Sequence, residues 1–140
     1  MVHKYIFHGI GKNKKSTFSS HWHIHHKLCK KNNFKDKCYI KTPLHFSVKK
    51  ELTSLLLLVI VHLPLLFISW FFYVSLIFFS ARYFYLHRKS HIDIEWGKKN
   101  LPWHYDHHMG KDQDANWGVT NPLWDYILGT RIRWKMKRSN

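Results

Sequence analysis

An apolar run constrains the fold of this chain more than any other feature. The stretch "LTSLLLLVIVHLPLLFISWFFYVSLIFFS", residues 52–80, carries one histidine and no charged side chain. As a single straight helix it would extend roughly 44 Å, well beyond the ~30 Å hydrocarbon core of a bilayer. Pro64 lies about a third of the way along and would break or kink such a helix. The run therefore predicts a helical hairpin, with arms from about Phe46 to His62 and from Leu65 to Leu86.

We expect this hairpin to be transmembrane, with Lys49, Lys50 and Glu51 at the membrane interface. Two crossings would leave the polar segments 1–45 and 87–140 on one side, whereas a single kinked crossing would separate them. The prediction is a single domain over residues 1–140: an all-α integral membrane protein whose histidine-rich cap lies on the cytosolic face. The net charge of +15 suits a surface that meets anionic lipid. No recognisable nucleic-acid module accompanies it, so we expect no nucleic-acid partner.

Histidine is the second unusual feature, because 11 of the 13 histidines fall into four groups. His45 and His62 stand alone, and we expect neither to bind metal; His62 is predicted to be a polar group at the hairpin turn. The four groups are His3 with His8, then His21, His23, His25 and His26, then His87 with His91, and finally His104, His107 and His108.

The spacing of the C-terminal groups predicts a metal site. His87 and His91 are four apart, and His104, His107 and His108 follow an i, i+3, i+4 pattern, so each group occupies one face of a helix. Neutral imidazole is a common ligand of zinc, iron, copper and nickel. Five such ligands exceed what one tetrahedral site can use. The pattern therefore predicts two metal ions.

The N-terminal groups leave more open. His3 and His8 are five apart, about 140° around an ideal α-helix, so one of them could serve the other metal or only support a ligand. His21 pairs with His25 at i, i+4 and His23 with His26 at i, i+3, and the choice between His21 and His23 as a ligand stays open. The two cysteines, Cys29 and Cys38, are expected to be reduced thiols.

Four stretches resemble the histidine boxes and closing segment of the membrane fatty acid hydroxylase and sterol desaturase superfamily. They are "HKYIFHGIGKNKKSTFSSHWHIHH", "HRKSH", "HYDHH" and "NWGVTNPLWDYILGT". The resemblance implies cytosolic helices that bind two iron ions, which zinc can replace, and a reaction that uses O₂ to hydroxylate a lipid, most simply a fatty acyl chain. Carried over by position, the implied metal ligands are His3, His8, His21 or His23, His25, His26, His87, His91, His104, His107 and His108.

The resemblance also implies partners. The chain has no flavin, haem or iron–sulfur motif, so electrons must come from an external donor resembling cytochrome b5 or ferredoxin, and the substrate is a membrane lipid. A sterol or carotenoid oxidase of the same superfamily is one alternative, and a non-catalytic or truncated metal-binding homologue is another. Family members usually carry helices before the first box, whereas Met1 precedes His3 by two residues, which predicts an N-terminally incomplete chain. Four carboxylates could orient imidazoles or serve only as loop and cap residues: Asp106, Asp112, Asp114 and Asp125.

Overall fold

The computed structural model describes residues 2–41 and 46–134, and every regular element in those two ranges is a helix. The all-α prediction is therefore confirmed for this part of the chain; His45 lies outside it. In chain order the elements are η1 (His3–Gly9), η2 (Ile10–Lys12), η3 (His21–His25), α1 (His26–Lys31), α2 (Cys38–Lys41), α3 (Phe46–Val61), α4 (Leu65–Ile68), α5 (Trp70–Ile92), α6 (Ile94–Asn100), α7 (Pro102–Met109) and α8 (Leu123–Ile127).

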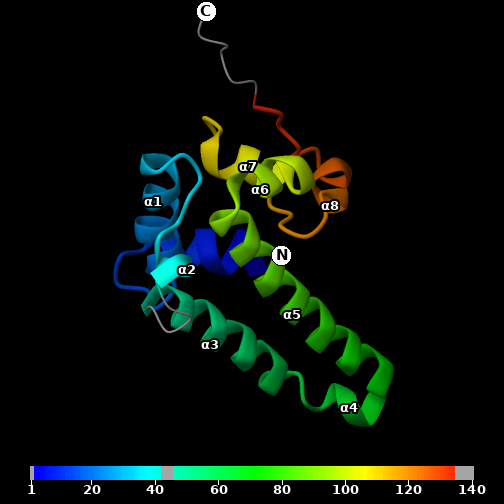
Figure 1. The fold of residues 1–140 in the computed structure, drawn as a ribbon. Helices are drawn as coiled ribbons and strands as arrows, with labels where there is room; N and C mark the ends of the chain where they lie inside the picture. Colours follow the sequence, from blue (N-terminus) through cyan, green and yellow to red (C-terminus); the bar gives the residue numbers. More distant parts are fainter. Residues whose placement is uncertain (1, 42–45, 135–140) are drawn as a thin grey trace, which may run out of the picture.

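The apolar run does fold into a helical hairpin, in which α3 and α5 lie side by side (Figure 1). The chain turns at residues 62–64, where the Nδ1–H of His62 donates to the carbonyl of Leu58 at 2.8 Å. Pro64 follows, and the second arm is itself divided, because Ser69 adopts an extended conformation between α4 and α5. His62 therefore lies at the turn, as the sequence predicts.

The predicted membrane crossing is wrong. Within residues 2–41 and 46–134, no helix is both long and apolar enough to span a bilayer. The first arm, α3, has 16 residues, which rise about 24 Å against the ~30 Å of a hydrocarbon core. The second arm, α5, has 23 residues but includes Arg82, Arg88 and Lys89. This finding contradicts the predicted transmembrane hairpin and the predicted integral membrane location. It also removes the basis for placing the cap on the cytosolic face.

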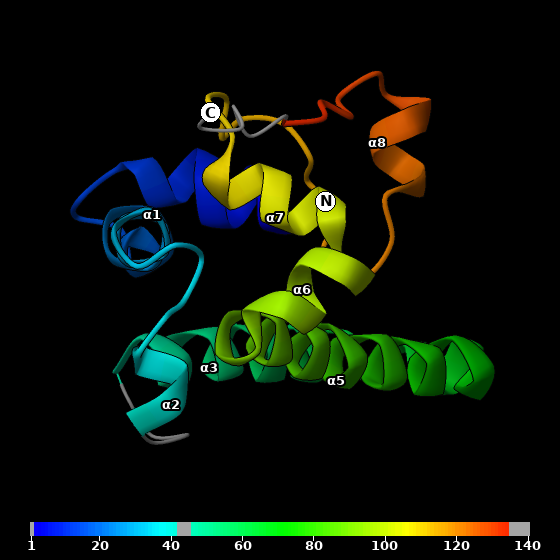
Figure 2. The same ribbon diagram turned by 45° about the horizontal axis from the view of Figure 1, so that its top comes forward.

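The polar segments before and after the hairpin meet at one end of it and form a cap (Figure 2). Short local signals set its helices at angles to one another. The side chain of Asp93 accepts the backbone N–H of Trp96 at 3.0 Å, which ends α5 and starts α6. Pro102 occupies the first turn of α7, where its missing N–H costs nothing. Gly110 follows the last residue of α7. Two short turns thus fold the histidines of α7 back onto the end of α5.

The interior of the cap consists largely of imidazole rings. The largest fully buried side chains include six histidines besides His8, namely His26, His87, His91, His104, His107 and His108. Few aliphatic side chains are buried among the described residues; Val48, Leu101 and Val119 are examples. Buried polar atoms must find partners or incur a desolvation cost. Histidine is therefore the commonest residue type among the largest fully buried side chains of the described residues.

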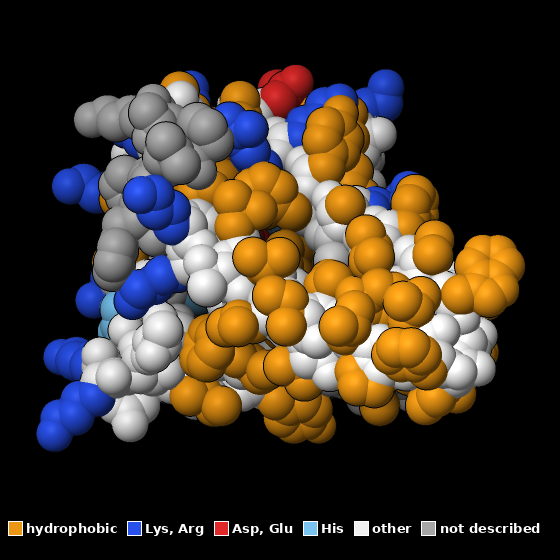
Figure 3. Space-filling view, turned by 90° about the horizontal axis from the view of Figure 1, so that it is seen from below, with side chains coloured by type: hydrophobic (Ala, Val, Ile, Leu, Met, Phe, Trp, Pro, Cys, Tyr) orange, Lys and Arg blue, Asp and Glu red, His pale blue; other side chains and the backbone are white. Residues whose placement is uncertain are grey.

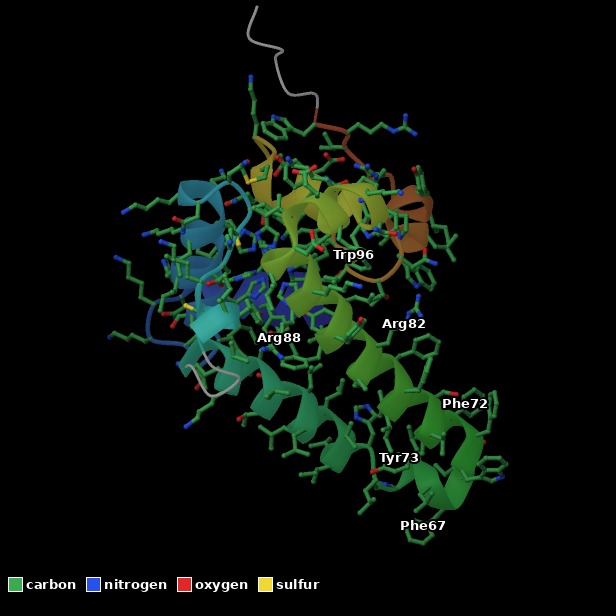
Figure 4. The ribbon with its side chains drawn as sticks, viewed as in Figure 1. Phe67, Phe72, Tyr73, Arg82, Arg88 and Trp96 are labelled. Carbon is green, nitrogen blue, oxygen red and sulfur yellow. The ribbon has the colours of Figure 1, made fainter. Side chains whose placement is uncertain are left out.

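The hairpin, in contrast, exposes its apolar side chains. In the space-filling view hydrophobic groups cover the hairpin face, and lysine and arginine side chains lie at its margins (Figure 3). Phe67 and Ile68 at the tip are 88% and 79% exposed. Figure 4 places Phe67 at the far end of the hairpin and Arg88 close to the cap. A continuous apolar surface of this kind marks a contact site rather than ordinary surface variation.

Candidate metal centre

Two π-helical turns resolve the awkward spacing of the N-terminal histidines. The i to i+5 repeat of a π-helix brings residues five apart nearly into line, and such turns are frequent at functional sites. η1 carries both His3 and His8. η3 begins at His21 and runs directly into α1, which begins at His26. In each pair the two rings face the same interior, which an ideal α-helix would not allow.

One group of five histidines, here called cluster 1, has converging Nε2 atoms. The Nε2 of His8 lies 3.0 Å from that of His26 and 3.1 Å from that of His107. The Nε2 of His21 lies 3.0 Å from that of His3 and 3.3 Å from that of His26. Two nitrogens that each lie about 2.1 Å from a shared ion are roughly 3.0–3.4 Å apart at coordination angles of 90–109°. The separations in cluster 1 thus have the dimensions of a coordination shell.

The other five, here called cluster 2, are His25, His87, His91, His104 and His108. His91 and His104 approach with their Nε2 atoms 3.1 Å apart. The ring of His25 lies 4.5 Å from His91 and 4.8 Å from His108, centroid to centroid, and its Nε2 is buried without a hydrogen-bond partner. The Nε2 of His87 and both nitrogens of His108 are likewise buried and unpartnered. The two clusters adjoin, with the rings of His26 and His108 4.3 Å apart.

Hydrogen bonds on the outer side of the rings determine where the lone pairs point. The Nδ1–H of His3 donates to the carbonyl of Trp117 at 3.0 Å, and that of His107 donates to Ala115 at 2.6 Å. In cluster 2 the Nδ1–H of His91 donates to Phe34 at 2.8 Å. A neutral imidazole with its proton on Nδ1 carries a lone pair on Nε2. The lone pairs of these rings therefore face inward, towards other Nε2 atoms, and a cation between them would remove their repulsion.

Burial keeps the rings neutral, which is the form that binds metal. Loss of solvation lowers the pKa of His8 to about 2 and that of His107 to about 4, and neighbouring histidines lower the pKa of His8 further. For His104 and His108 burial is again the main cause of a pKa well below the usual value, followed by neighbouring histidines. Because none of these rings has to lose a proton near neutral pH, a metal ion would meet free lone pairs.

Two buried carboxylates support cluster 2. The Nδ1–H of His25 donates to Asp36 at 2.6 Å, and the Nδ1–H of His87 donates to Glu51 at 2.5 Å. Tyr39 also donates its hydroxyl to Glu51. Burial, the largest single cause, would raise the pKa of Asp36, but the hydrogen bond and charge of His25 and the hydrogen bonds from Cys38 together lower it. The same balance, with His87 as the main opposing cause, lowers the pKa of Glu51. Both groups stay ionised behind their histidines.

The structure separates His21 from His23. His21 lies inside cluster 1, whereas the ring of His23 turns outward and its Nε2 contacts the carbonyl of Lys12 at 2.9 Å. All ten of the other predicted ligands come together. His107 leaves its α7 neighbours and joins cluster 1, so the two clusters do not follow the division into N-terminal and C-terminal groups.

The carboxylates expected behind the histidines are mostly elsewhere. Asp106 pairs with Arg131 at 2.7 Å, and Asp112 accepts the N–H of Asp114 at 2.8 Å. Asp114 comes closest to the expected role, 3.6 Å from the Nδ1 of His8, but it is half exposed and pairs with Lys12 at 2.6 Å.

Asp125 contacts no histidine ring directly; it holds in place the loop that contacts His3. It accepts the backbone N–H groups of Trp117 and Gly118 at 2.7 and 2.8 Å, and Trp117 in turn supports His3. The sequence reasoning missed Asp36 and Glu51. The available signal was that Glu51 is the only acidic residue between Asp36 and Asp93.

Cys29 and Cys38, which were predicted to be reduced thiols, are both buried, and neither takes part in a disulfide. Cys29 lies close enough to His25, His91 and His108 to form a third possible metal-binding group. Its Sγ is, however, 3.5 Å from the Nδ1 of His91 and 3.8 Å from that of His25, and both of those nitrogens already donate outward. Burial raises the pKa of the Cys29 thiol well above its usual value, so it stays protonated. Cys29 therefore packs behind cluster 2.

Two clefts reach His3 from different directions. An apolar cleft of about 210 Å³ runs between α3 and α5 and is lined by Leu55, Leu58, Leu76 and Phe79, with His3 at its edge. A second cleft of about 370 Å³ is lined by His3 and by the loop from Trp117 to Trp124. His3 of cluster 1 thus borders both of these clefts, whereas a smaller cavity of about 20 Å³ is lined by His21 of cluster 1 and His25 of cluster 2.

A comparison of the chain with protein-family models, curated proteins and solved structures finds no match. The site therefore rests on its own geometry. Its buried groups of histidine, joined in one case by Cys29, could hold metal ions.

Proposed function

We propose that this chain is a dinuclear metal oxygenase that uses O₂ and external electrons to hydroxylate a lipid, most simply a fatty acyl chain. The observation that carries the proposal is the convergence of imidazole nitrogens from buried histidines in two adjoining clusters. Iron bound there would supply the oxidant that breaks an alkyl C–H bond, which no side chain can provide. The resemblance to the fatty acid hydroxylase and sterol desaturase superfamily supplies the reaction class.

The apolar cleft supports an alkyl substrate. Leu58 of α3 and Phe79 of α5 both line this cleft, which His3 lines as well. Such walls would hold an extended hydrocarbon and exclude water from the bond to be oxidised. The second cleft, beyond His3, would leave room for the polar end of the lipid or for its release. The apolar outer surface of the hairpin continues the walls of the first cleft and suits contact with the lipid that supplies substrate (Figure 3).

In this proposal an external electron donor docks on α1. Its outer face exposes Lys27, Lys30 and Lys31, while the same helix carries His26 into cluster 1. A basic patch attracts an acidic partner and speeds its association at low salt. A small acidic redox protein bound to α1 would thus lie one helix away from the histidines.

The test is oxygen incorporation. The full chain is loaded with Fe²⁺, given a fatty acid in detergent micelles, a ferredoxin reducing system and ¹⁸O₂, and the lipid is analysed by mass spectrometry. A product hydroxyl labelled with ¹⁸O supports the proposal. The variant Leu58→Trp should fill the apolar cleft and reduce product at least tenfold while keeping its metal, and the variant His62→Ala, at the distant turn, should behave as wild type. Two equivalents of iron without labelled product would instead favour the non-catalytic alternative.

A further inference from the structure

We infer that the two metal positions are unequal: cluster 2 takes up the first ion and retains it, and cluster 1 is the exchangeable position. The inference concerns the metal centre of the proposed function and does not depend on the reaction it performs. It rests on the groups that accept the Nδ1–H of each histidine ring. In cluster 2 two hydrogen bonds from Nδ1, those of His25 and His87, end on carboxylates, and that of His91 ends on a backbone carbonyl. In cluster 1 the hydrogen bonds of His3 and His107 end on neutral backbone carbonyls.

A carboxylate behind an imidazole strengthens its bond to a cation. It accepts the Nδ1–H, draws the proton outward and so raises the electron density at Nε2, and it adds a negative charge close to the ion. Asp36 is fully buried and Glu51 is 6% exposed, so little water screens either charge. Both also accept a second donor, the backbone N–H of Cys38 for Asp36 and the hydroxyl of Tyr39 for Glu51. These bonds fix the carboxylates in place before any ion arrives.

Cluster 1 has no comparable support among the described residues. Its nearest carboxylate, Asp114, is 50% exposed, lies 3.6 Å from the Nδ1 of His8 and is neutralised by Lys12. Its rings rest on the carbonyls of Trp117 and Ala115, which orient them but bring no charge. A dication in cluster 1 would therefore meet five neutral imidazoles, and no buried carboxylate accepts a hydrogen bond from any of the described cluster 1 rings.

Access to the two positions differs in the same sense. His3 of cluster 1 borders both large clefts, whereas neither cleft is lined by His91, His104 or His108 of cluster 2. The cavity that a cluster 2 ring does line, His25 together with His21, measures only about 20 Å³. An ion in cluster 1 can exchange with the space that would hold substrate. An ion in cluster 2 lies behind rings that are completely buried. Cluster 2 thus combines stronger metal binding with poorer access from the clefts. A protein that holds a single metal ion therefore holds it in cluster 2.

The test is a stepwise titration of the metal-stripped full chain with Co²⁺ at pH 7.5, in competition with a chromophoric chelator. Wild type should show one tight and one weaker equivalent. The double variant Asp36→Asn, Glu51→Gln keeps the size of both side chains and should weaken the tight equivalent at least tenfold, in line with the 10–100-fold effect of such outer groups. The weaker equivalent should change less than threefold. The matched control Asp114→Asn should leave the tight equivalent unchanged.

A second pair of variants assigns the positions even if the double variant does not fold. His107→Ala should lose the weaker equivalent and keep the tight one, and His104→Ala should lose the tight one; circular dichroism checks that each is folded. Two equivalents of equal affinity in wild type would overturn the inference. So would loss of the tight equivalent in His107→Ala, or equal weakening of both equivalents in the double variant. Any of these results would leave the oxygenase proposal standing, whereas absence of Co²⁺ binding would refute both.

Discussion

Lowering the pH from 7.5 to 5.5 should strongly destabilise the metal-free protein. Burial lowers the pKa of His8 to about 2 and of His107 to about 4, while the same residues in the unfolded chain titrate near 6.5. Across this pH range the unfolded state therefore takes up protons that the folded state does not bind, so stability falls as the pH falls. Each such histidine costs about 1.4 kcal/mol over the interval, roughly 2.7 kcal/mol for the two.

The other buried histidines act in the same direction. Burial lowers the pKa values of His3, His21, His26, His91 and His104 well below the usual value. The figure of about 2.7 kcal/mol is therefore a lower bound, and it is already a large part of the 5–15 kcal/mol that stabilises a typical domain. With a urea slope of about 2 kcal/mol/M, the midpoint of unfolding should drop by more than about 1 M.

The assay is urea unfolding of the chelator-treated chain, followed by circular dichroism at pH 7.5, 6.5 and 5.5. The variant His62→Ala removes a histidine outside the clusters and should show the full shift. The variant His107→Gln should lose about 1.4 kcal/mol of the pH dependence, whatever it does to the absolute stability. An unfolding midpoint that stays constant or rises between pH 7.5 and 5.5 would refute the reasoning, because it would mean that the rings are solvated in solution.

Two further substitutions test local geometry. The variant His21→Ala should reduce metal content by elemental analysis, whereas His23→Ala should leave it within error of wild type, since only His21 joins cluster 1; equal losses would contradict the assignment. At Gly97 a Cβ would lie 2.8 Å from the carbonyl oxygen of Ser90 and 2.9 Å from the Phe34 ring, so Gly97→Ala should cost about 1–3 kcal/mol in urea unfolding. Its control Gly9→Ala, where the nearest atom is 3.6 Å away, should not be destabilised by overlap.

The histidine groups were predictable because each is defined by spacings within a short stretch of sequence. The i, i+4 pair His87 and His91 needs only a helix, and α5 extends far enough to include both. The placement of His107 in a different cluster from His108 was not predictable, because it depends on how α7 crosses η1 and α1. The i+5 pairs needed π-helical turns, for which sequence periodicity gives no signal. The pattern of histidines thus indicated a shared site, and tertiary packing decided its division into two.

The membrane prediction failed because a count of apolar residues ignores where helices begin and end. Residues 52–80 are apolar, but Pro64 and the extended Ser69 divide them among three helices. The first of these also includes Lys49, Lys50 and Glu51, and the last extends beyond the apolar run to Ile92. The chain therefore has apolar segments and a long helix, but no described helix is both long enough and apolar enough to span a bilayer.

Glu51 shows what the membrane interpretation concealed. Placed beside Lys49 and Lys50 at the edge of an apolar run, it was expected at a membrane interface, yet it is buried against His87 and Tyr39. A buried carboxylate is stable only where donors surround it, and the imidazole and phenol supply them. Its hydrogen bonds attach the start of α3 to the end of α5, on the outer side of cluster 2. Glu51 therefore stabilises both the base of the hairpin and cluster 2. Loss of its hydrogen bonds to His87 and Tyr39 should destabilise both.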